Sequence, residues 1–151
     1  MENRVRFLYR SIDLRDWDEI KKLLLELHLE THKLRPDVYS PEVELKREDY
    51  NDQFFGYGFF EGKKLLGLCW GYLKSNGRPD VVGFVEDFIV HEPYRGRGIG
   101  SKLFDEFGRM CRTRGANALE LLTTAENKKA IEFYSKQDMG LVSYHLRKEW
   151  R

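Results

Sequence analysis

The sequence predicts an α/β domain in which helices flank a central mixed β-sheet. Segments rich in β-branched and aromatic residues alternate with segments whose apolar residues recur every three or four positions. In chain order these segments read strand, two helices, three strands, helix, strand, helix and strand. Strands joined by short turns pair antiparallel and strands joined through a helix pair parallel, so we expect a mixed sheet.

The first expected elements are a strand and a long helix. Residues 5–9 mix β-branched and aromatic side chains and are typical of a strand. Asp13 is placed to cap a helix whose apolar stripe runs from Trp17 to Leu27. Pro36 disfavours a helical conformation in the residue before it, so the helix should end there.

A short second helix and a hairpin are expected next. Ser40 and Pro41 look like the cap and the first residue of a helix that runs to about residue 47. Residues 54–60 and 65–73 favour two strands, joined by a short turn that contains glycine.

The second half of the chain alternates strands with amphipathic helices. The expected elements are a strand at 81–90, a helix over about 103–111 that stops at Gly115, a strand at 119–123, a helix at 127–136 and a last strand at 141–146. No repeat or linker interrupts this order, so we expect one domain over residues 1–151.

Charge and cysteine content exclude several classes of protein. The 26 Lys and Arg residues against 25 Asp and Glu residues leave a net charge of +1, which argues against binding to nucleic acid or to a charged membrane surface. Cys69 and Cys111 have no CxxC spacing, and no segment reaches the ~20 apolar residues of a membrane span. We therefore expect a soluble cytoplasmic protein.

An arginine- and glycine-rich loop between a strand and a helix predicts a phosphate site. Gly96, Gly98 and Gly100 remove the Cβ atoms that would keep a ligand off the backbone. The helix that follows offers unpaired N–H groups at its positive end. Arg95 and Arg97 add forked donors that suit a di- or triphosphate.

Two other interpretations of this loop stay open at this point. Glycines alone can mark a tight turn. A dinucleotide-binding loop is the second alternative, but the Gly-x-Gly-x-Gly spacing differs from that pattern. No acidic residue about twenty positions further on is clearly placed for a ribose.

The run Arg95-x-x-Gly98-x-Gly100 resembles the acetyl-CoA pyrophosphate loop of the GNAT N-acetyltransferase family. Downstream, Asn127 and Tyr134 lie seven residues apart, as in the family's Asn-x-x-Ala-x-x-x-Tyr helix. Seven residues make two helical turns, so both side chains face the same way. The resemblance is specific over about residues 81–139. It implies the GNAT acyl-CoA N-acyltransferase fold and an enzyme that transfers an acetyl group from acetyl-CoA directly to a primary amine.

The resemblance also implies roles for individual residues. Main-chain groups of Phe88, Ile89 and Val90 would pair with the pantetheine arm, and Asn127 would bond nearby. Tyr134 would protonate the departing CoA thiolate, and no metal is needed. The implied cofactor-binding residues are Phe88, Ile89, Val90, Arg95, Gly96, Arg97, Gly98, Ile99, Gly100, Ser101, Asn127 and Tyr134.

The amine must lose a proton before it attacks, so a base is expected. Phe84 and Leu122 stand where other branches of the family carry a glutamate. The run Glu86-Asp87-Phe88-x-Val90 instead resembles spermidine/spermine acetyltransferases and related small-amine enzymes. Regular alternation puts Glu86 on the strand face of Phe88, so Glu86 is the candidate base or amine-orienting carboxylate.

Alternatives to the Glu86 assignment remain. A water chain could carry the proton, and both Glu86 and Asp87 could be solvated surface carboxylates. Only one of the two is expected to face the cleft.

The segment after the first long helix supplies candidate acceptor contacts. His32, Asp37 and Tyr39 lie in the stretch that covers the acceptor in this family, although an exposed loop explains them equally well. His28 and His32 are four residues apart, but no third metal ligand is spaced with them, so no metal site is expected.

A small cationic amine, such as a polyamine, is the expected acceptor. A protein N-terminal or lysine acetyltransferase, an aminoglycoside acetyltransferase and a non-catalytic CoA-binding domain remain alternatives. After Tyr134 about seventeen residues remain, which is room for one strand and leaves a sheet edge open. A second copy would cover such an edge, so we expect a homodimer.

Overall fold

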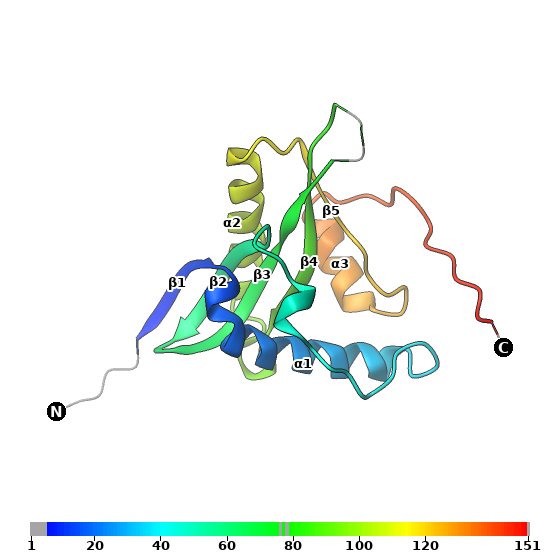
Figure 1. Cartoon of the computed structure of the whole chain (residues 1–151), viewed down its shortest axis with the longest axis horizontal. Coiled ribbons are helices and arrows are strands. Elements are labelled where there is room, and N and C mark those ends of the chain that lie inside the picture. Colours follow the sequence, from blue (N-terminus) through cyan, green and yellow to red (C-terminus); the bar gives the residue numbers. More distant parts are fainter. Residues whose placement is uncertain (1–5, 76, 78, 151) are drawn as a thin grey trace.

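Five strands form one sheet with helices on both faces in the computed structural model, which describes residues 6–75, 77 and 79–150 (Figure 1). The strands are β1 (Phe7–Ile12), β2 (Phe55–Glu61), β3 (Lys64–Lys74), β4 (Val82–Val90) and β5 (Ala118–Leu121), and the helices are α1 (Trp17–Leu34), α2 (Ile99–Thr113) and α3 (Lys128–Lys136). The strands lie in the order β1-β2-β3-β4-β5. Neighbours from β1 to β4 are antiparallel and β4 and β5 are parallel, which confirms the predicted mixed α/β sheet.

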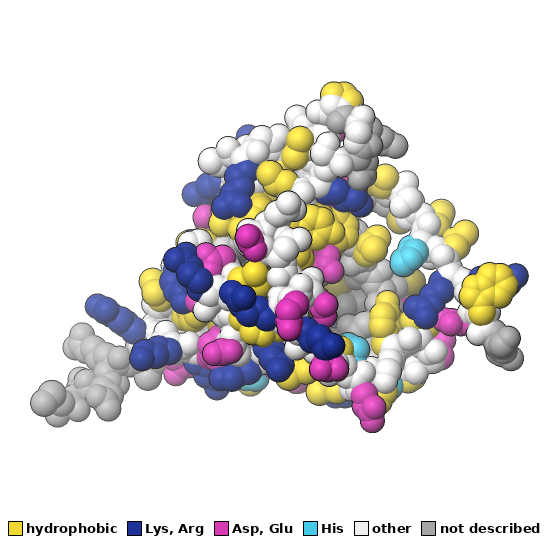
Figure 2. Space-filling view, in the orientation of Figure 1, with side chains coloured by type: hydrophobic (Ala, Val, Ile, Leu, Met, Phe, Trp, Pro, Cys, Tyr) yellow, Lys and Arg dark blue, Asp and Glu magenta, His cyan; other side chains and the backbone are white. Residues whose placement is uncertain are grey.

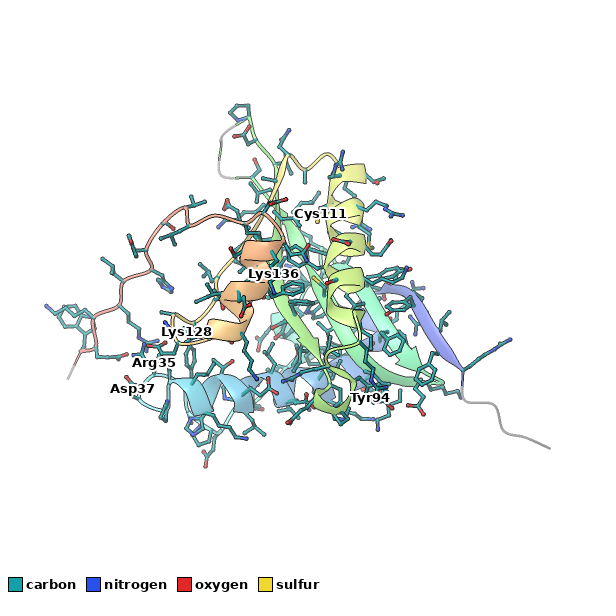
Figure 3. All side chains as sticks on the ribbon, turned by 180° about the vertical axis from the view of Figure 1, so that it is seen from behind. Arg35, Asp37, Tyr94, Cys111, Lys128 and Lys136 are labelled. Atoms are coloured by element: carbon teal, nitrogen blue, oxygen red, sulfur yellow. The ribbon has the colours of Figure 1, made fainter. Side chains whose placement is uncertain are left out.

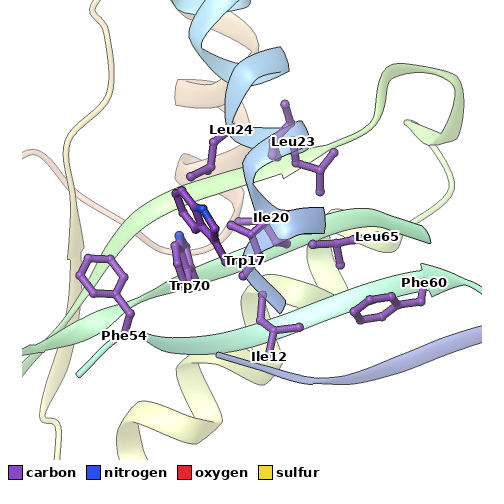
Figure 4. Packing of buried hydrophobic residues seen from close by; sticks show 11 residues of the cluster. Ile12, Trp17, Ile20, Leu23, Leu24, Phe54, Phe60, Leu65 and Trp70 are labelled. Carbon is purple, nitrogen blue, oxygen red and sulfur yellow. The ribbon is translucent and has the colours of Figure 1, made fainter. Parts of the chain in front are cut away.

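Helix α1 packs on one face of the sheet through the predicted apolar stripe (Figure 4). Ile20, Leu23 and Leu24 are buried against residues of the strands, among them Leu68 and Trp70, which are fully buried. Burying each such side chain contributes roughly 1.5–3 kcal/mol. This cluster fixes α1 beside β3 and β4.

Helices α2 and α3 lie on the opposite face. Leu103 and Phe107 of α2 are fully buried in a second cluster with residues of β2, β3 and β4. Phe133 of α3 packs against Phe88 of β4 and Phe104 of α2, with ring centroids 5.3 and 5.8 Å apart. The two clusters therefore lie on opposite sides of β4, the strand that leads into the glycine-rich loop.

The ends of α1 follow from local chemistry. Asp13 caps a single 3₁₀ turn (Leu14–Asp16), where its side chain accepts a hydrogen bond from the Arg15 N–H. Helix α1 starts after that turn and ends at Leu34, two residues before Pro36, as predicted. The first strand runs to Ile12, beyond the expected end, and the expected residue 5 lies outside the described residues.

The predicted helix after Ser40 is wrong. Residues 40–46 have no regular structure, and only a 3₁₀ turn follows (Arg47–Asp49). The Ser40 hydroxyl accepts from the Glu42 N–H, a local turn that competes with a helix. Leu45 packs on the α1 cluster while Val43 is exposed, so the segment has no apolar stripe to hold a helix against the sheet.

The predicted last strand at 141–146 is also wrong. The chain from Met139 to Trp150 has no regular structure and leads away from the body of the molecule (Figure 1). Hydrophobic side chains are spaced along it (Figure 2), and those of Leu141, Val142, Tyr144, Leu146 and Trp150 are 75–86% exposed. Strand-forming residues need a paired edge and a surface to pack on, and this segment has neither among the described residues.

Candidate functional site

A gap opens in the sheet where β5 stops. Strand β5 pairs with β4 only from Val82 to Val85, whereas β4 continues to Val90. Beyond Val85, no described strand lies along the edge of β4 that faces away from β3. Backbone N–H and C=O groups on such an edge are available to a ligand.

The gap is part of a cavity of about 860 Å³, a size typical of small-molecule sites. Helix α1, the end of β4, the start of α2 and helix α3 all contribute to its walls. Most of the residues predicted from the sequence line it: Tyr39, Glu86, Phe88, Ile89, Val90, Arg95, Gly96, Gly98, Ile99, Gly100, Ser101, Asn127 and Tyr134. His32, Asp37 and Arg97 do not.

The glycines of the β4–α2 loop (residues 91–98) serve the backbone conformation. Gly96 and Gly98 have φ values of 79° and 81°, which favour glycine. A Cβ atom on either would meet nothing within 4 Å, so open space lies beside both. Gly98 gives α2 no side-chain cap, which leaves the first N–H groups of the helix available to an anion.

Gly100 has a packing role in addition to the one expected. A Cβ atom there would lie 3.3 Å from Cζ of Phe88, so the glycine allows α2 to approach β4 closely. The third glycine of the motif therefore serves packing between helix and strand, in addition to lining the cavity.

The two arginines lie differently from the expectation that both face a phosphate. Arg95 donates from Nε to the Val90 carbonyl at 2.6 Å and from Nη2 to Glu30 Oε1 at 2.6 Å. The guanidinium of Arg97 lies over the ring of Tyr94, 5.2 Å from its centroid. An anion in this loop would therefore depend mainly on backbone N–H groups.

Tyr134 reaches the cavity from α3. Its ring packs against Phe88 and Phe104, with centroids 6.2 and 5.9 Å apart. Burial raises the pKa of its phenol above the usual value, so it is protonated at neutral pH. Asn127 begins the same helix, because its side-chain oxygen accepts from the Ala130 N–H at 3.2 Å. Asn127 thus has a structural role as the N-cap of α3.

Two neighbouring carboxylates form the opposite wall. Trp70 Nε1 donates to Asp87 Oδ2 at 2.8 Å. Burial raises the pKa of Asp87 to about 6, although the Trp70 hydrogen bond acts in the other direction. Partial desolvation also raises the pKa of Glu86. Burial raises the pKa of Tyr50, and the charges of Asp87 and Glu86 add to this effect. All three side chains line the cavity.

Because of a β-bulge, the geometry of these carboxylates differs from the expected one. The register changes from Trp70 opposite Asp87 to Gly71 opposite Val85, so Glu86 has no opposite residue on β3. Regular alternation with Phe88 therefore does not hold at Glu86. Both carboxylates line the cavity, and the expectation that only one would do so is wrong.

A signal for this bulge is present in the sequence. Gly71 lies inside a strand, where glycine often marks a bulge or a close approach of two backbones. A Cβ atom at Gly71 would lie 1.7 Å from the Phe84 carbonyl oxygen, so only glycine fits. Tyr50 also lines the cavity but has no such signal in the sequence, because it follows a 3₁₀ turn in an irregular segment.

His32 and Asp37 do not line the cavity, and both make contacts within residues 32–39. His32 Nδ1 contacts the Tyr39 carbonyl, and His28 Nε2 contacts the Ser40 carbonyl at 2.6 Å. Asp37 pairs with Arg35 at 2.9 Å (Figure 3). These contacts fold the chain after α1 back onto the helix and direct Tyr39 toward the cavity.

A second ion pair joins the segment after α1 to the segment before α3. Arg35 also pairs with Glu126 at 3.2 Å, and Glu126 precedes the N-cap of α3. Among the described residues, no group of three or more His, Cys, Asp or Glu side chains could hold a metal ion. No described helix has the length and apolar character that crossing a membrane requires.

The sequence of this chain is similar to those of known acetyltransferases. The sequence profile of the Acetyltransferase (GNAT) family matches residues 17–140. The thialysine N-epsilon-acetyltransferase of Bos taurus is 35% identical over 129 residues, covering 79% of this chain and 75% of that protein. The spermidine/spermine N(1)-acetyltransferase-like protein 1 of Homo sapiens is 23% identical, covering 95% of this chain but only 22% of that protein.

The fold has a match among solved structures. The crystal structure of a mutant BH1408 protein from Bacillus halodurans superposes with a TM-score of 0.81. Its sequence is 20% identical, and the match covers 95% of this chain and 99% of that one. At this identity the comparison concerns the fold alone.

Proposed function

This chain belongs to the acetyltransferase (GNAT) family and is an N-acetyltransferase, and we propose that it transfers the acetyl group of acetyl-CoA to a primary amine of a small cationic molecule. One observation carries this proposal. A single cavity combines an unpaired strand edge next to a glycine-rich helix start with a pair of carboxylates on the other side. The first suits an acyl-CoA, and the second suits an amine.

The donor half of the cavity would bind acetyl-CoA mainly through the backbone. N–H groups of Gly96, Gly98 and the first turn of α2 would hold the pyrophosphate. The open edge from Phe88 to Val90 would pair with the amide groups of the pantetheine arm, as an added strand does. The acetyl group would then lie near Tyr134 and the carboxylates.

The carboxylates would prepare the acceptor. An amine bound as an ammonium ion would give a proton to the Glu86–Asp87 pair, whose raised pKa values favour proton acceptance near neutral pH. The neutral nitrogen would attack the thioester carbonyl, forming the C–N bond as the C–S bond breaks. Tyr134 would give its proton to the departing thiolate, and the tyrosinate would take up the second proton that the nitrogen loses as the amide forms.

The acceptor class rests on charge and shape. Glu86 and Asp87 favour a cation, and Leu24, Leu27 and Leu45 give the same cavity an apolar wall that suits a methylene chain. The names of the two relatives, which refer to thialysine and to spermidine and spermine, support an aliphatic amine acceptor.

We also propose a homodimer that works in the cytoplasm. The outer edge of β5 has no described neighbour, and the segment from Leu141 to Trp150 carries exposed apolar side chains. A second copy could cover both. Cys69 and Cys111 are free and buried, as suits a reducing compartment. Light scattering in solution tests the dimer, and a monomer at all concentrations would exclude it.

The decisive experiment measures free thiol release from acetyl-CoA with polyamines, thialysine, aminoglycosides and peptides as acceptors, with thermal shift by CoA in parallel. We expect turnover with the small aliphatic amines and a stabilising shift with CoA. Turnover with peptides alone would overturn the acceptor class. A CoA shift without turnover would indicate a binding domain, and no shift would exclude the cofactor.

A further inference from the structure

Arg95 connects three parts of the molecule. Its Nε donates to the carbonyl of Val90 at the end of β4. Its Nη2 lies 2.6 Å from Glu30 Oε1 and 3.4 Å from Glu26 Oε2, both on α1. The residue itself lies in the β4–α2 loop, directly before Gly96. A single side chain therefore joins the loop to a strand end and to a helix.

Glu26 also holds the beginning of the same loop. Its Oε1 lies 2.5 Å from His91 Nδ1, and its Oε2 accepts from the Glu92 N–H at 3.3 Å. Glu26 and Glu30 are four residues apart, so they lie on one face of α1. The two carboxylates thus contact the loop at His91, Glu92 and Arg95, on the chain immediately before its glycines.

We propose that Glu26 and Glu30 are positioning residues for the acyl-CoA, acting through Arg95 and His91 on the β4–α2 loop. The inference rests on the proposed use of that loop for the pyrophosphate. In this arrangement Arg95 is a link within the protein, and its guanidinium does not bind the phosphate directly.

The glycines explain why the loop needs external support. Gly96 and Gly98 have positive φ values and wide conformational freedom, so the loop does not fix the direction of its own N–H groups. Helix α1 is rigidly placed, because Leu23 and Leu24 are buried in the cluster against the sheet. Contacts from α1 therefore hold the loop in a fixed position relative to the core, and this orients the N–H groups at the start of α2.

The exposure of these groups predicts which property changes. The side chains of Glu26, Glu30 and Arg95 are 25%, 34% and 41% exposed, and partly exposed ion pairs contribute little to global stability. Loss of one carboxylate should leave the protein folded. Its effect should appear in the affinity of the loop for its ligand.

The test compares Glu30→Gln, Glu26→Gln and Arg95→Ala with Glu106→Gln, which breaks an ion pair with Arg109 on α2. Calorimetry gives the Kd of CoA, and steady-state rates give KM and kcat for acetyl-CoA. We expect each of the three variants to raise Kd and KM by roughly three- to tenfold, with kcat and thermal midpoint nearly unchanged. Glu106→Gln should change none of them.

The sign of the Glu30→Gln effect distinguishes the two roles of Arg95. If the guanidinium bound phosphate directly, removal of Glu30 would release it, and CoA would bind equally well or more tightly. That result would overturn the inference. The double variant that combines Glu30→Gln with Arg95→Ala should weaken CoA binding no more than Arg95→Ala alone, since both changes break the same contact. Additive effects of the two substitutions would also contradict the inference. Wild-type protein that fails to bind CoA would overturn the proposed function itself.

Discussion

Trp70 and Asp87 lie opposite each other on β3 and β4 and share a hydrogen bond from the indole Nε1 to Oδ2, 2.8 Å long. Trp70 is fully buried in the α1 cluster, whereas Asp87 lines the cavity. The bond therefore holds a titratable carboxylate at a fixed position between core and site. Burial favours the protonated acid and the indole N–H favours the carboxylate, and burial has the larger effect.

The pKa of Asp87 predicts how activity depends on pH. The carboxylate accepts a proton only when it is ionised, and its pKa is raised from 3.8 to about 6. We expect kcat/KM to rise through pH 6 and to fall about tenfold per unit below it. Rates from pH 5 to 8 in constant ionic strength test this. A profile that is flat down to pH 5 would exclude Asp87 as the base.

The same shift predicts that Asp87→Asn stabilises the protein. Because the folded pKa lies above the unfolded one, the folded state loses stability as pH rises from about 4 to about 6, and the cost persists above that. Asparagine can still accept from Trp70 but carries no charge. At pH 8 we expect stability to rise by roughly 1–3 kcal/mol in denaturant unfolding, while turnover falls. Asp105→Asn, an exposed change of equal charge, is the control and should change neither.

Tyr134→Phe separates acid catalysis from binding. The phenol is protonated at neutral pH because burial raises its pKa, and phenylalanine keeps the packing against Phe88 and Phe104. We expect the Kd of CoA to change less than twofold and kcat to fall roughly 10²-fold, a typical effect for a general acid. Tyr144→Phe, on an exposed ring, should leave both unchanged. Wild-type turnover in Tyr134→Phe would remove the acid assignment.

The sequence was sufficient to predict the elements in which local preference and tertiary packing favour the same structure. The stripe containing Ile20 and Leu23 predicted α1, and the alternation of strands and helices predicted the mixed sheet. It was insufficient to predict segments whose structure depends on a neighbouring strand or a packing surface. Residues 141–146 have the composition of a strand, but a strand forms only against a paired edge. Ser40 has the chemistry of a cap, but no apolar stripe follows it.

For the site, the sequence predicted which residues take part better than it predicted which partners their side chains contact. The spacing of Gly96 and Gly98 located the loop, because only glycine readily adopts their positive φ values. The partners of Arg95 could not be predicted, since Glu26 and Glu30 lie more than sixty residues away. The sequence also did not predict that Glu86 and Asp87 both line the cavity, because this depends on a one-residue shift in strand register.

Gly98→Ala tests the loop against a matched glycine. Gly98 and Gly115 have φ values of 81° and 97°, and a Cβ atom on either meets nothing within 4 Å. Both substitutions should therefore cost similar stability, about 1–2 kcal/mol, by strain alone. Only Gly98→Ala also places a methyl group beside the proposed phosphate site. We expect its Kd for CoA to rise at least tenfold, with Gly115→Ala unchanged; equal affinities would contradict the loop assignment.

Trp70→Phe tests the link between core and carboxylate. The substitution removes the indole N–H, so the pKa of Asp87 should rise further and the acidic limb of the rate profile should move to higher pH. The smaller ring also leaves a cavity in the core, which should destabilise the protein by roughly 1–3 kcal/mol. Trp17→Phe is the matched control, because Trp17 is buried in the same cluster, whereas the indole bonded to Asp87 is that of Trp70. It should lower stability without moving the profile. A shift of the limb in both variants would mean that core packing alone sets the pKa, and no shift in Trp70→Phe would mean that another group controls the acidic limb.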